Sequence, residues 1–188
     1  MDFELADVTT PPPTPSSYWV LPGRLLAGAY PGHREPAEHQ ARIHGIVDSG
    51  VRLFLNLMEE NETNHAGQPF VPYAEVAAQR APAVRVSRHA VRDLSIPTSS
   101  QMIGILDTID ASMASDAPVY VHCWGGVGRT GTVIGCWLLR HGLAQPDNVL
   151  EILKELRQQD QERRHRRSPE TEQQENFVRH WLAQENQA

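Results

Sequence analysis

The apolar residues of this chain follow two spacings, which predict strands and helices in alternation. Compact runs of apolar and β-branched residues predict short strands at residues 18–21, 24–29, 51–58, 84–89 and 119–121. Apolar residues at helical spacing predict helices at residues 35–49, 72–79, 98–109, 130–143 and 146–159. A last helix should begin with Ser168 as its N-cap and Pro169 at its first position, and should continue through Leu182.

This alternation predicts the fold class. Strands that alternate with helices form mostly parallel sheets, and the near-continuous apolar run at residues 51–58 is typical of a strand buried on both faces. We therefore expect an α/β, three-layer fold with a central, mostly parallel sheet of about five strands and helices on both sides. A chain of 188 residues accommodates one such domain and is too short for two of ordinary size.

The first 17 residues follow neither spacing. They combine acidic residues with a segment rich in proline, serine and threonine, which favours a flexible arm over a helix or a strand. A proline-rich docking motif is an alternative interpretation of the same composition. We expect residues 1–17 to form a flexible N-terminal arm and residues 18–188 to form a single domain.

Composition narrows the classes of function. The formal net charge is −6, which disfavours nucleic acid as a partner. No apolar run approaches the ~20 residues of a membrane span, and no signal peptide opens the sequence. The two cysteines show no pairing pattern, which is typical of a reducing compartment. We expect a cytoplasmic monomer without a membrane span.

The strongest chemical signal is the glycine-rich segment at residues 123–129, between a predicted strand and a predicted helix. In such a turn several backbone N–H groups point at one spot, and the helix dipole favours negative charge there. A thiol in this position ionises readily, so Cys123 is the expected nucleophile. The planar fork of Arg129 matches two phosphoryl oxygens, which lysine cannot do. Together these groups predict a site for phosphoryl transfer.

The residues His122-Cys123-x5-Arg129-Thr130-Gly131 resemble the signature of the cysteine-dependent protein tyrosine and dual-specificity phosphatase superfamily. The residues inside this signature are similar to the loop of kinase-associated phosphatases and their bacterial relatives, which implies that they bind phosphate together with the arginine. These residues are Trp124, Gly125, Gly126, Val127 and Gly128. A rhodanese-type sulfurtransferase fits less well, because its loop is one residue shorter.

Two residues that flank this loop have expected roles. His122 can hold the loop from behind through its ring nitrogens. The hydroxyl of Thr130 can donate to the sulfur of Cys123 when that sulfur departs. The second cysteine, Cys136, lies seven residues after Arg129, which is about 10 Å further along the predicted helix at 1.5 Å per residue. It cannot readily form a disulfide with Cys123, so we expect a buried apolar side chain there.

The expected general acid is Asp93, on a loop between a predicted strand and the helix that follows Pro97. The carboxyl ends of parallel strands meet at one edge of a sheet, so this loop should lie beside Cys123. Asp93-x-x-x-Pro97 resembles the general-acid loop of dual-specificity phosphatases, and the leaving oxygen needs a proton. The alternative is a structural carboxylate paired with Arg88 or Arg92.

Three further segments have weaker signals. Residues 170–174 resemble the Gln-Thr-x-x-Gln segment of tyrosine phosphatases, which implies that Gln174, or its neighbour Gln173, orients the hydrolytic water. Residues 59–68 form a polar loop whose acids could shape a substrate mouth, although a solvated loop is the favoured interpretation. The basic run at residues 163–167 either attracts an acidic or phosphorylated partner or is a solvated linker.

The resemblance implies the phosphatase form of the three-layer fold and a phosphoric monoester hydrolase acting on phosphotyrosine of proteins, with phosphoserine and phosphothreonine left open. The route passes through a phosphocysteine on Cys123, with Asp93 as general acid and base, and needs neither a metal nor another cofactor. One alternative is a phosphatase of phosphoinositides or small phosphate esters. The loop has no positive charge beyond Arg129, which argues against this alternative. The other is a non-catalytic phospho-binding module, against which the intact Cys123, Arg129 and Asp93 argue.

Overall fold

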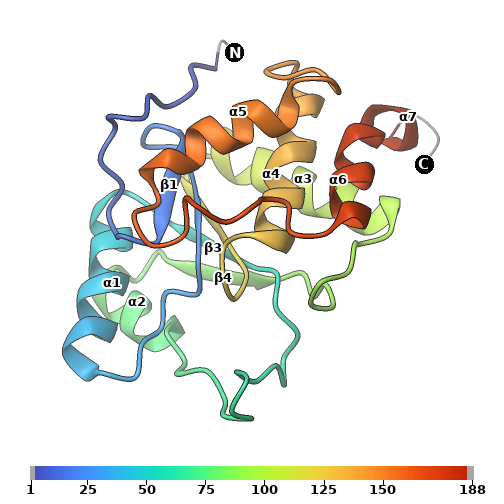
Figure 1. Cartoon of the computed structure of the whole chain (residues 1–188). Coiled ribbons are helices and arrows are strands. Elements are labelled where there is room, and N and C mark those ends of the chain that lie inside the picture. Colours follow the sequence, from blue (N-terminus) through green and yellow to red (C-terminus); the bar gives the residue numbers. More distant parts are fainter. Residues whose placement is uncertain (1–2, 186–188) are drawn as a thin grey trace.

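The computed structural model describes residues 3–185; residues 1–2 of the expected arm and residues 186–188 of the expected domain lie outside the described residues. Its centre is a sheet with helices around it (Figure 1). The sheet has five strands in the spatial order β1-β2-β5-β3-β4. The strands are β1 (Ser17–Leu21), β2 (Leu25–Gly28), β3 (Leu53–Asn56), β4 (Arg85–Arg88) and β5 (Val119–His122). Only β1 is antiparallel to its neighbour, so the predicted mostly parallel sheet is confirmed.

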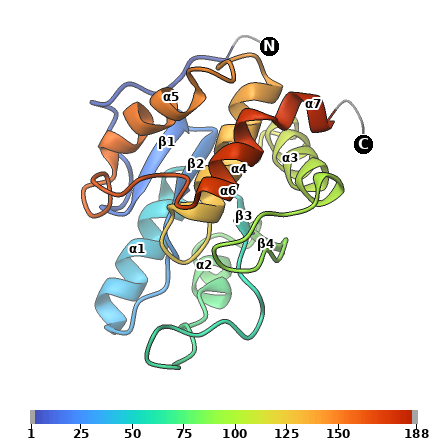
Figure 2. The same cartoon turned by 45° about the vertical axis from the view of Figure 1, so that its right-hand side comes forward.

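Helices cover both faces of this sheet, as predicted. One face packs against α1 (Pro36–Asp48) and α2 (Ala74–Arg80). The other packs against α3 (Ser99–Ala114), α4 (Gly128–Arg140) and α5 (Val149–Leu156), which the 3-10 helix η1 (Arg157–Gln159) follows. The last two helices, α6 (Glu172–Arg179) and α7 (Trp181–Glu185), lie on α4 (Figure 2). Within the described residues, no helix has the length and apolarity to cross a membrane.

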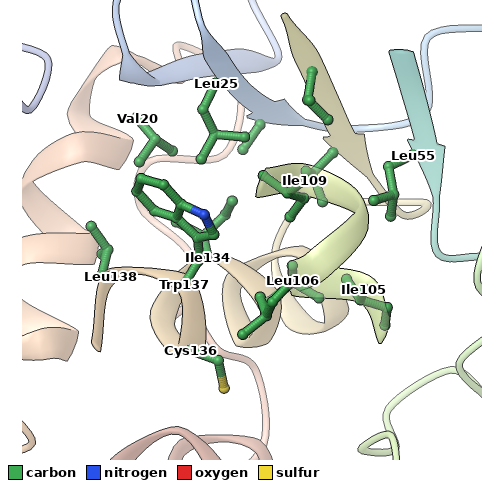
Figure 3. Packing of buried hydrophobic residues seen from close by; sticks show 14 of the residues in the cluster. Val20, Leu25, Leu55, Ile105, Leu106, Ile109, Ile134, Cys136, Trp137 and Leu138 are labelled. Carbon is green, nitrogen blue, oxygen red and sulfur yellow. The ribbon is translucent and has the colours of Figure 1, made fainter. Parts of the chain in front are cut away.

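The core fixes β5 and α4 relative to each other. On β5, Tyr120 packs on the α1 side and Val121 on the α4 side, because successive residues of a strand point to opposite faces. From α4, Trp137 points toward the sheet and packs among side chains that include Val20 and Leu25 (Figure 3). Cys136 is buried in the same cluster, as predicted. The loop that joins β5 to α4 is therefore held between two anchored elements.

The last helix begins later than we predicted and is interrupted. Ser168 is not its N-cap, because the Ser168 hydroxyl donates to the carbonyl of Val127 at 2.7 Å. The N-cap is Thr171, whose side chain accepts from the N–H of Gln174 at 3.2 Å in a capping box. The helix predicted to reach Leu182 ends at Arg179, and α7 follows separately.

The described part of the arm lies against the domain. The ring of Phe3 meets that of Trp137 edge-on, with 5.3 Å between centroids. The N–H of Ala6 donates to the carbonyl of Val20 at 3.0 Å. These contacts differ from the flexible arm that we expected for residues 1–17. The expectation rested on the overall composition of the segment, which does not show that single apolar residues such as Phe3 pack on the core. The division of the chain at residue 17 remains a prediction.

Candidate active site

Parallel strands bring the predicted site loops to one edge of the sheet. The segments that follow β4 and β5 emerge there side by side with the segment that follows β3. They enclose a cavity of about 330 Å³. Its lining includes Cys123, Arg129 and Asp93, together with Trp124, Gly125 and Gly128. The structure thus brings the expected nucleophile, arginine and acid to one place.

The loop from Cys123 to α4 depends on Gly126. Its φ is +66°, a left-handed conformation that favours glycine, and a Cβ there would collide with the backbone of Gly28. In the described part of the chain, the N–H groups of Gly125, Gly126 and Val127 donate to no acceptor. These donors, at the start of α4, are available to the oxygens of an anion.

Arg129 is almost fully enclosed, with 1% of its side chain exposed. Nη1 donates to Oε2 of Glu62 at 2.6 Å and Nη2 to Oε1 at 2.8 Å, a bidentate ion pair. Nη1 also donates to the carbonyl of Val91 at 3.1 Å, and Nη2 lies 2.9 Å from Oδ1 of Asp93. Within the described residues, Nε is buried without a partner.

The charge and orientation of Arg129 follow from these contacts. Burial by itself lowers the pKa of Arg129, but the hydrogen bonds to Glu62 and the charges of Glu62 and Asp93 raise that pKa by more, so the guanidinium stays charged. Glu62 holds both terminal nitrogens from one side. The edge that carries Nε and Nη2 remains for an incoming anion, provided that the anion replaces Asp93.

Glu62 is the residue that sequence reasoning undervalued. We favoured a solvated loop for residues 59–68, yet only 10% of the Glu62 side chain is exposed. Arg88 fixes this loop, because its Nη1 donates to the carbonyls of Met58 at 2.8 Å and Glu59 at 3.2 Å. The only sequence signal was an acid in a polar loop after a buried strand, which is too common to identify a partner for Arg129.

The Glu62→Gln variant should lose both stability and any activity that depends on Arg129. The amide leaves a buried guanidinium short of one counter-charge, which costs roughly 3 kcal/mol, the lower part of the range for a broken buried pair, because Asp93 remains nearby. Urea unfolding and kcat/KM measure the two effects. Glu60→Gln, on the exposed part of the same loop, is the matched control. Equal stability of both variants would contradict the assigned pairing.

Asp93 occupies a tight turn at the rim of the cavity. The N–H of Ser95 donates to the carbonyl of Arg92 at 3.1 Å, and Leu94 has a φ of +58°, which is strained for a residue other than glycine. The Asp93 side chain is 48% exposed, and among the described residues it forms its ion pair with Arg129, not with Arg88 or Arg92 as in the structural alternative. It therefore lies beside the expected phosphate position.

Thr130 and Gln174 make contacts other than those expected of them. The hydroxyl of Thr130 donates to the carbonyl of Gly28 at 3.5 Å, at the limit of a hydrogen bond, and not to Cys123. Oε1 of Gln174 accepts from the N–H of Glu170 at 3.0 Å in the capping region, and Nε2 donates to the carbonyl of Ser95 at 3.1 Å. Gln174 thus fastens α6 to the turn that carries Asp93, and its role toward water remains a prediction.

His122 lies behind the loop, where the expected holding role requires it. Its Nδ1 donates to the carbonyl of Cys123 at 3.3 Å, so Nε2 is the acceptor for the hydroxyl of Tyr73 at 2.7 Å. Burial raises the pKa of Tyr73, which keeps this phenol protonated. Burial also lowers the pKa of His122 from 6.5 to about 3, so the ring is neutral.

This buried histidine should make the fold sensitive to acid. Because its pKa is lower in the folded chain, its contribution to stability is complete above about pH 6.5 and is lost as the pH falls toward 3. Between about pH 7.5 and 5 the loss should be about 2 kcal/mol. Urea unfolding of the parent and of His122→Asn at both pH values measures it. An identical pH dependence in the two proteins would show that His122 is not the group that titrates.

The outer wall of the cavity comes from a distant part of the chain. Arg163, Arg166 and Glu170 line the cavity together with Asp93. Trp124 extends the rim on the loop side, and its ring lies 4.5 Å from that of His65 between centroids. The basic run that sequence analysis left undecided therefore reaches the candidate site.

Solved structures with the same fold include several phosphatases. Kinase associated phosphatase (KAP) is similar with a TM-score of 0.70 and 17% identity, over 87% of this chain and 88% of that chain. Tk-PTP in its active form has a TM-score of 0.65 and 22% identity, over 93% and 99%. PTPMT1 in complex with PI(5)P has a TM-score of 0.65 and 18% identity, over 88% and 94%. At these identities the likeness shows the fold.

Curated relatives match parts of the chain. An uncharacterized protein of Methanocaldococcus jannaschii is 36% identical over 92 residues, which are 49% of this chain and 56% of that protein. The tyrosine-protein phosphatase cdc-14 of Caenorhabditis elegans is 24% identical over 129 residues, 65% of this chain and 16% of that protein. The chain spans little more than half the length of the first relatives it matches.

One family model matches most of the chain. It describes the DSP-PTPase phosphatase domain of Swiss Army Knife proteins, PTP-SAK, and it matches residues 14–178. The match includes the loop from Cys123 to Arg129, the turn of Asp93 and the segment that carries Gln174. The chain therefore belongs to the PTP-SAK family of DSP-PTPase phosphatase domains.

Proposed function

We propose that this protein hydrolyses phosphate monoesters of phosphotyrosine in proteins, and of phosphoserine and phosphothreonine, through a phosphocysteine. The observation that carries the proposal is the open edge of Arg129. Within the described residues its Nε has no partner, its Nη2 is shared with Asp93, and Arg129 lines the same cavity as Cys123 and the loop whose N–H groups have no acceptor. A dianionic phosphate is the group that such a set of donors suits.

In the first step, the thiolate of Cys123 attacks phosphorus, the S–P bond forms and the bond to the leaving oxygen breaks. The loop N–H groups and Arg129 hold the equatorial oxygens, so the charge that shifts onto them is stabilised without reorganisation. Cys123 itself has 3% of its surface exposed, so it is reached through the cavity alone. The phosphate takes the place of the Asp93 carboxylate on Nη2.

Displaced from Arg129, the Asp93 carboxylate takes up a proton from solvent and then gives this proton to the leaving oxygen of the substrate. In the second step the same carboxylate takes a proton from water, the water oxygen attacks phosphorus, and the S–P bond breaks to release inorganic phosphate. Thr130 assists the departing sulfur and Gln174 orients the water in this proposal. Thr130 would need a rotation of its hydroxyl away from the carbonyl of Gly28, whereas Gln174 would use the second N–H of Nε2, since the first donates to the carbonyl of Ser95.

The two alternatives have less support. PTPMT1, whose complex contains PI(5)P, shares the fold, but Tk-PTP shares it equally, so the fold does not favour a phosphoinositide as substrate. The inner loop from Trp124 to Gly128 carries no cation for a second phosphate on the same small ring. A non-catalytic binding module would have no need of an acid at 2.9 Å from the arginine.

Phosphate release from a panel of phosphotyrosine, phosphoserine and phosphoinositide substrates, in the presence of chelator, tests the proposal. We expect turnover of phosphotyrosine peptides without added metal. A phosphocysteine trapped by rapid acid quench should map to Cys123. Turnover of phosphoinositides alone would replace the proposed substrate class, and binding of phosphopeptides without turnover would support the non-catalytic module.

A further inference from the structure

The basic loop, defined here as residues 163–167, is built against the phosphate loop and is not a loose linker. The buried guanidinium of Arg157 donates from Nη1 to the carbonyl of Arg166 at 2.7 Å and from Nη2 to the carbonyl of Arg163 at 2.9 Å. Oδ1 of Asp160 accepts from the N–H of Arg163 at 2.9 Å. Arg157 and Asp160 are each at most 1% exposed, so the basic loop rests on a fixed base.

The other end of the basic loop is fastened directly to the phosphate loop. Ser168 follows it, and the Ser168 hydroxyl donates to the carbonyl of Val127. A Cβ on Gly131 would collide with this hydroxyl, so the two segments approach as closely as the glycine permits. The positions of the arginine backbones relative to the anion site are therefore set before any ligand arrives.

Two arginines of the basic loop face the cavity. A Cβ placed on Gly125 would lie only 3.7 Å from Nη1 of Arg166, and Arg163 lines the same wall. Both stand at the rim, with 28% of the Arg163 side chain and 43% of the Arg166 side chain exposed. Neither is catalytic, because both lie outside the loop that would hold the phosphate being removed.

Each of these arginines has one carboxylate partner. Arg163 pairs with Glu162 at 2.7 Å, and Arg166 pairs with Glu170. Glu170 lies near the start of α4, since its Oε2 would be 3.2 Å from a Cβ on Gly128. An arginine has five N–H donors, so one carboxylate leaves donors for a second anion.

We propose that Arg163 and Arg166 form a second anion subsite, which selects protein substrates with an acidic or phosphorylated residue beside the residue that is dephosphorylated. This inference rests on the proposed function and names its substrate class. A peptide is favoured over a small bisphosphate because the two cations stand at the rim, where a neighbouring side chain of a peptide passes. Among the described residues of the loop from Cys123 to Arg129, which forms the inner wall, Arg129 is the only cation.

The test compares kcat/KM on phosphotyrosine peptides that differ only in the neighbours of phosphotyrosine, which are glutamate, glutamine or phosphoserine. The parent should prefer the glutamate peptide by roughly fivefold, as partly exposed ion pairs allow, and the phosphoserine peptide by more. The preference should weaken as salt rises. In the double variant Arg163→Gln and Arg166→Gln it should disappear, while Glu170→Gln should increase it.

Arg164→Gln is the matched control, because Arg164 belongs to the same loop, is exposed and does not line the cavity. It should retain the full preference. Dissociation constants of the same peptides for Cys123→Ser measure binding at the subsite in the absence of turnover. The proposal of the subsite and the proposal of the reaction can therefore be contradicted separately. Equal kcat/KM and equal affinity of the parent for glutamate and glutamine peptides would overturn the subsite, as would a preference that survives in the double variant.

A third set of substrates distinguishes a small ligand from a peptide. Inositol monophosphate and inositol bisphosphates are compared in the same assays. A preference for the bisphosphates that the double variant abolishes, with no preference among peptides, would overturn the peptide proposal and assign the arginines to a small molecule.

Discussion

Replacement of Cys123 by serine should abolish turnover and leave phosphopeptide binding intact. A serine hydroxyl in this loop is not ionised at neutral pH, whereas the donors that hold the phosphate do not depend on the sulfur. Removal of a nucleophile costs on the order of 10⁶-fold in a serine protease, and we expect a loss of at least about 10³-fold here. Steady-state release of phosphate and a binding titration of the same variant measure the two quantities.

The control for this variant is Cys136→Ser, which removes the other thiol. Cys136 is fully buried on the far part of α4, and burial raises its pKa well above the ordinary value, so it is inert. We expect Cys136→Ser to retain activity and to remain sensitive to peroxide, because peroxide is small enough to reach Cys123 through the cavity. Residual turnover of Cys123→Ser within tenfold of the parent would remove Cys123 from the mechanism.

Asp93→Asn should lower kcat/KM by about 10²–10⁴-fold on phosphotyrosine peptides and far less on an activated aryl phosphate. The reason is the leaving group, since an acidic phenol departs without a proton whereas tyrosine does not. The amide also removes a negative charge beside Arg129, so binding of phosphate should tighten. The ratio of kcat/KM on the two substrates, and the inhibition constant of inorganic phosphate, measure these effects.

The second part of that prediction separates two roles of Asp93. As a general acid it acts on the leaving group, and as a partner of Arg129 it competes with the phosphate. Equal losses of kcat/KM on both substrates, with an unchanged inhibition constant of phosphate, would show that another residue is the general acid. A much larger loss on the phosphotyrosine peptide than on the aryl phosphate, together with tighter binding of inorganic phosphate, would support both roles at one carboxylate.

The features that could be predicted from the sequence are those that depend on residues close together in the chain. The sheet followed from short apolar runs, and the candidate nucleophile, phosphate loop and arginine from seven consecutive residues. Glu62 did not, because its partner Arg129 lies 67 positions away and only the fold brings them together. The start of α6 was predicted wrongly for the same reason. The Ser168 hydroxyl donates to the Val127 carbonyl, a tertiary contact that the local sequence does not show. Gln174 matched a family pattern, but the hydrogen bonds of its side chain join backbone atoms.

The link between Ser168 and Val127 also bears on how the protein is made. Domains form as the chain leaves the ribosome, from the N-terminus onward. The phosphate loop emerges before two of its supports, because the Val127 carbonyl accepts from Ser168, 41 residues later, and the turn of Asp93 is bonded through the Ser95 carbonyl to Gln174, 79 residues after Ser95. A nascent chain therefore carries the thiol before it carries the supports of the site. Ribosome-bound chains that stop before Ser168 should be inactive, so the cell would meet this phosphatase only as a finished molecule.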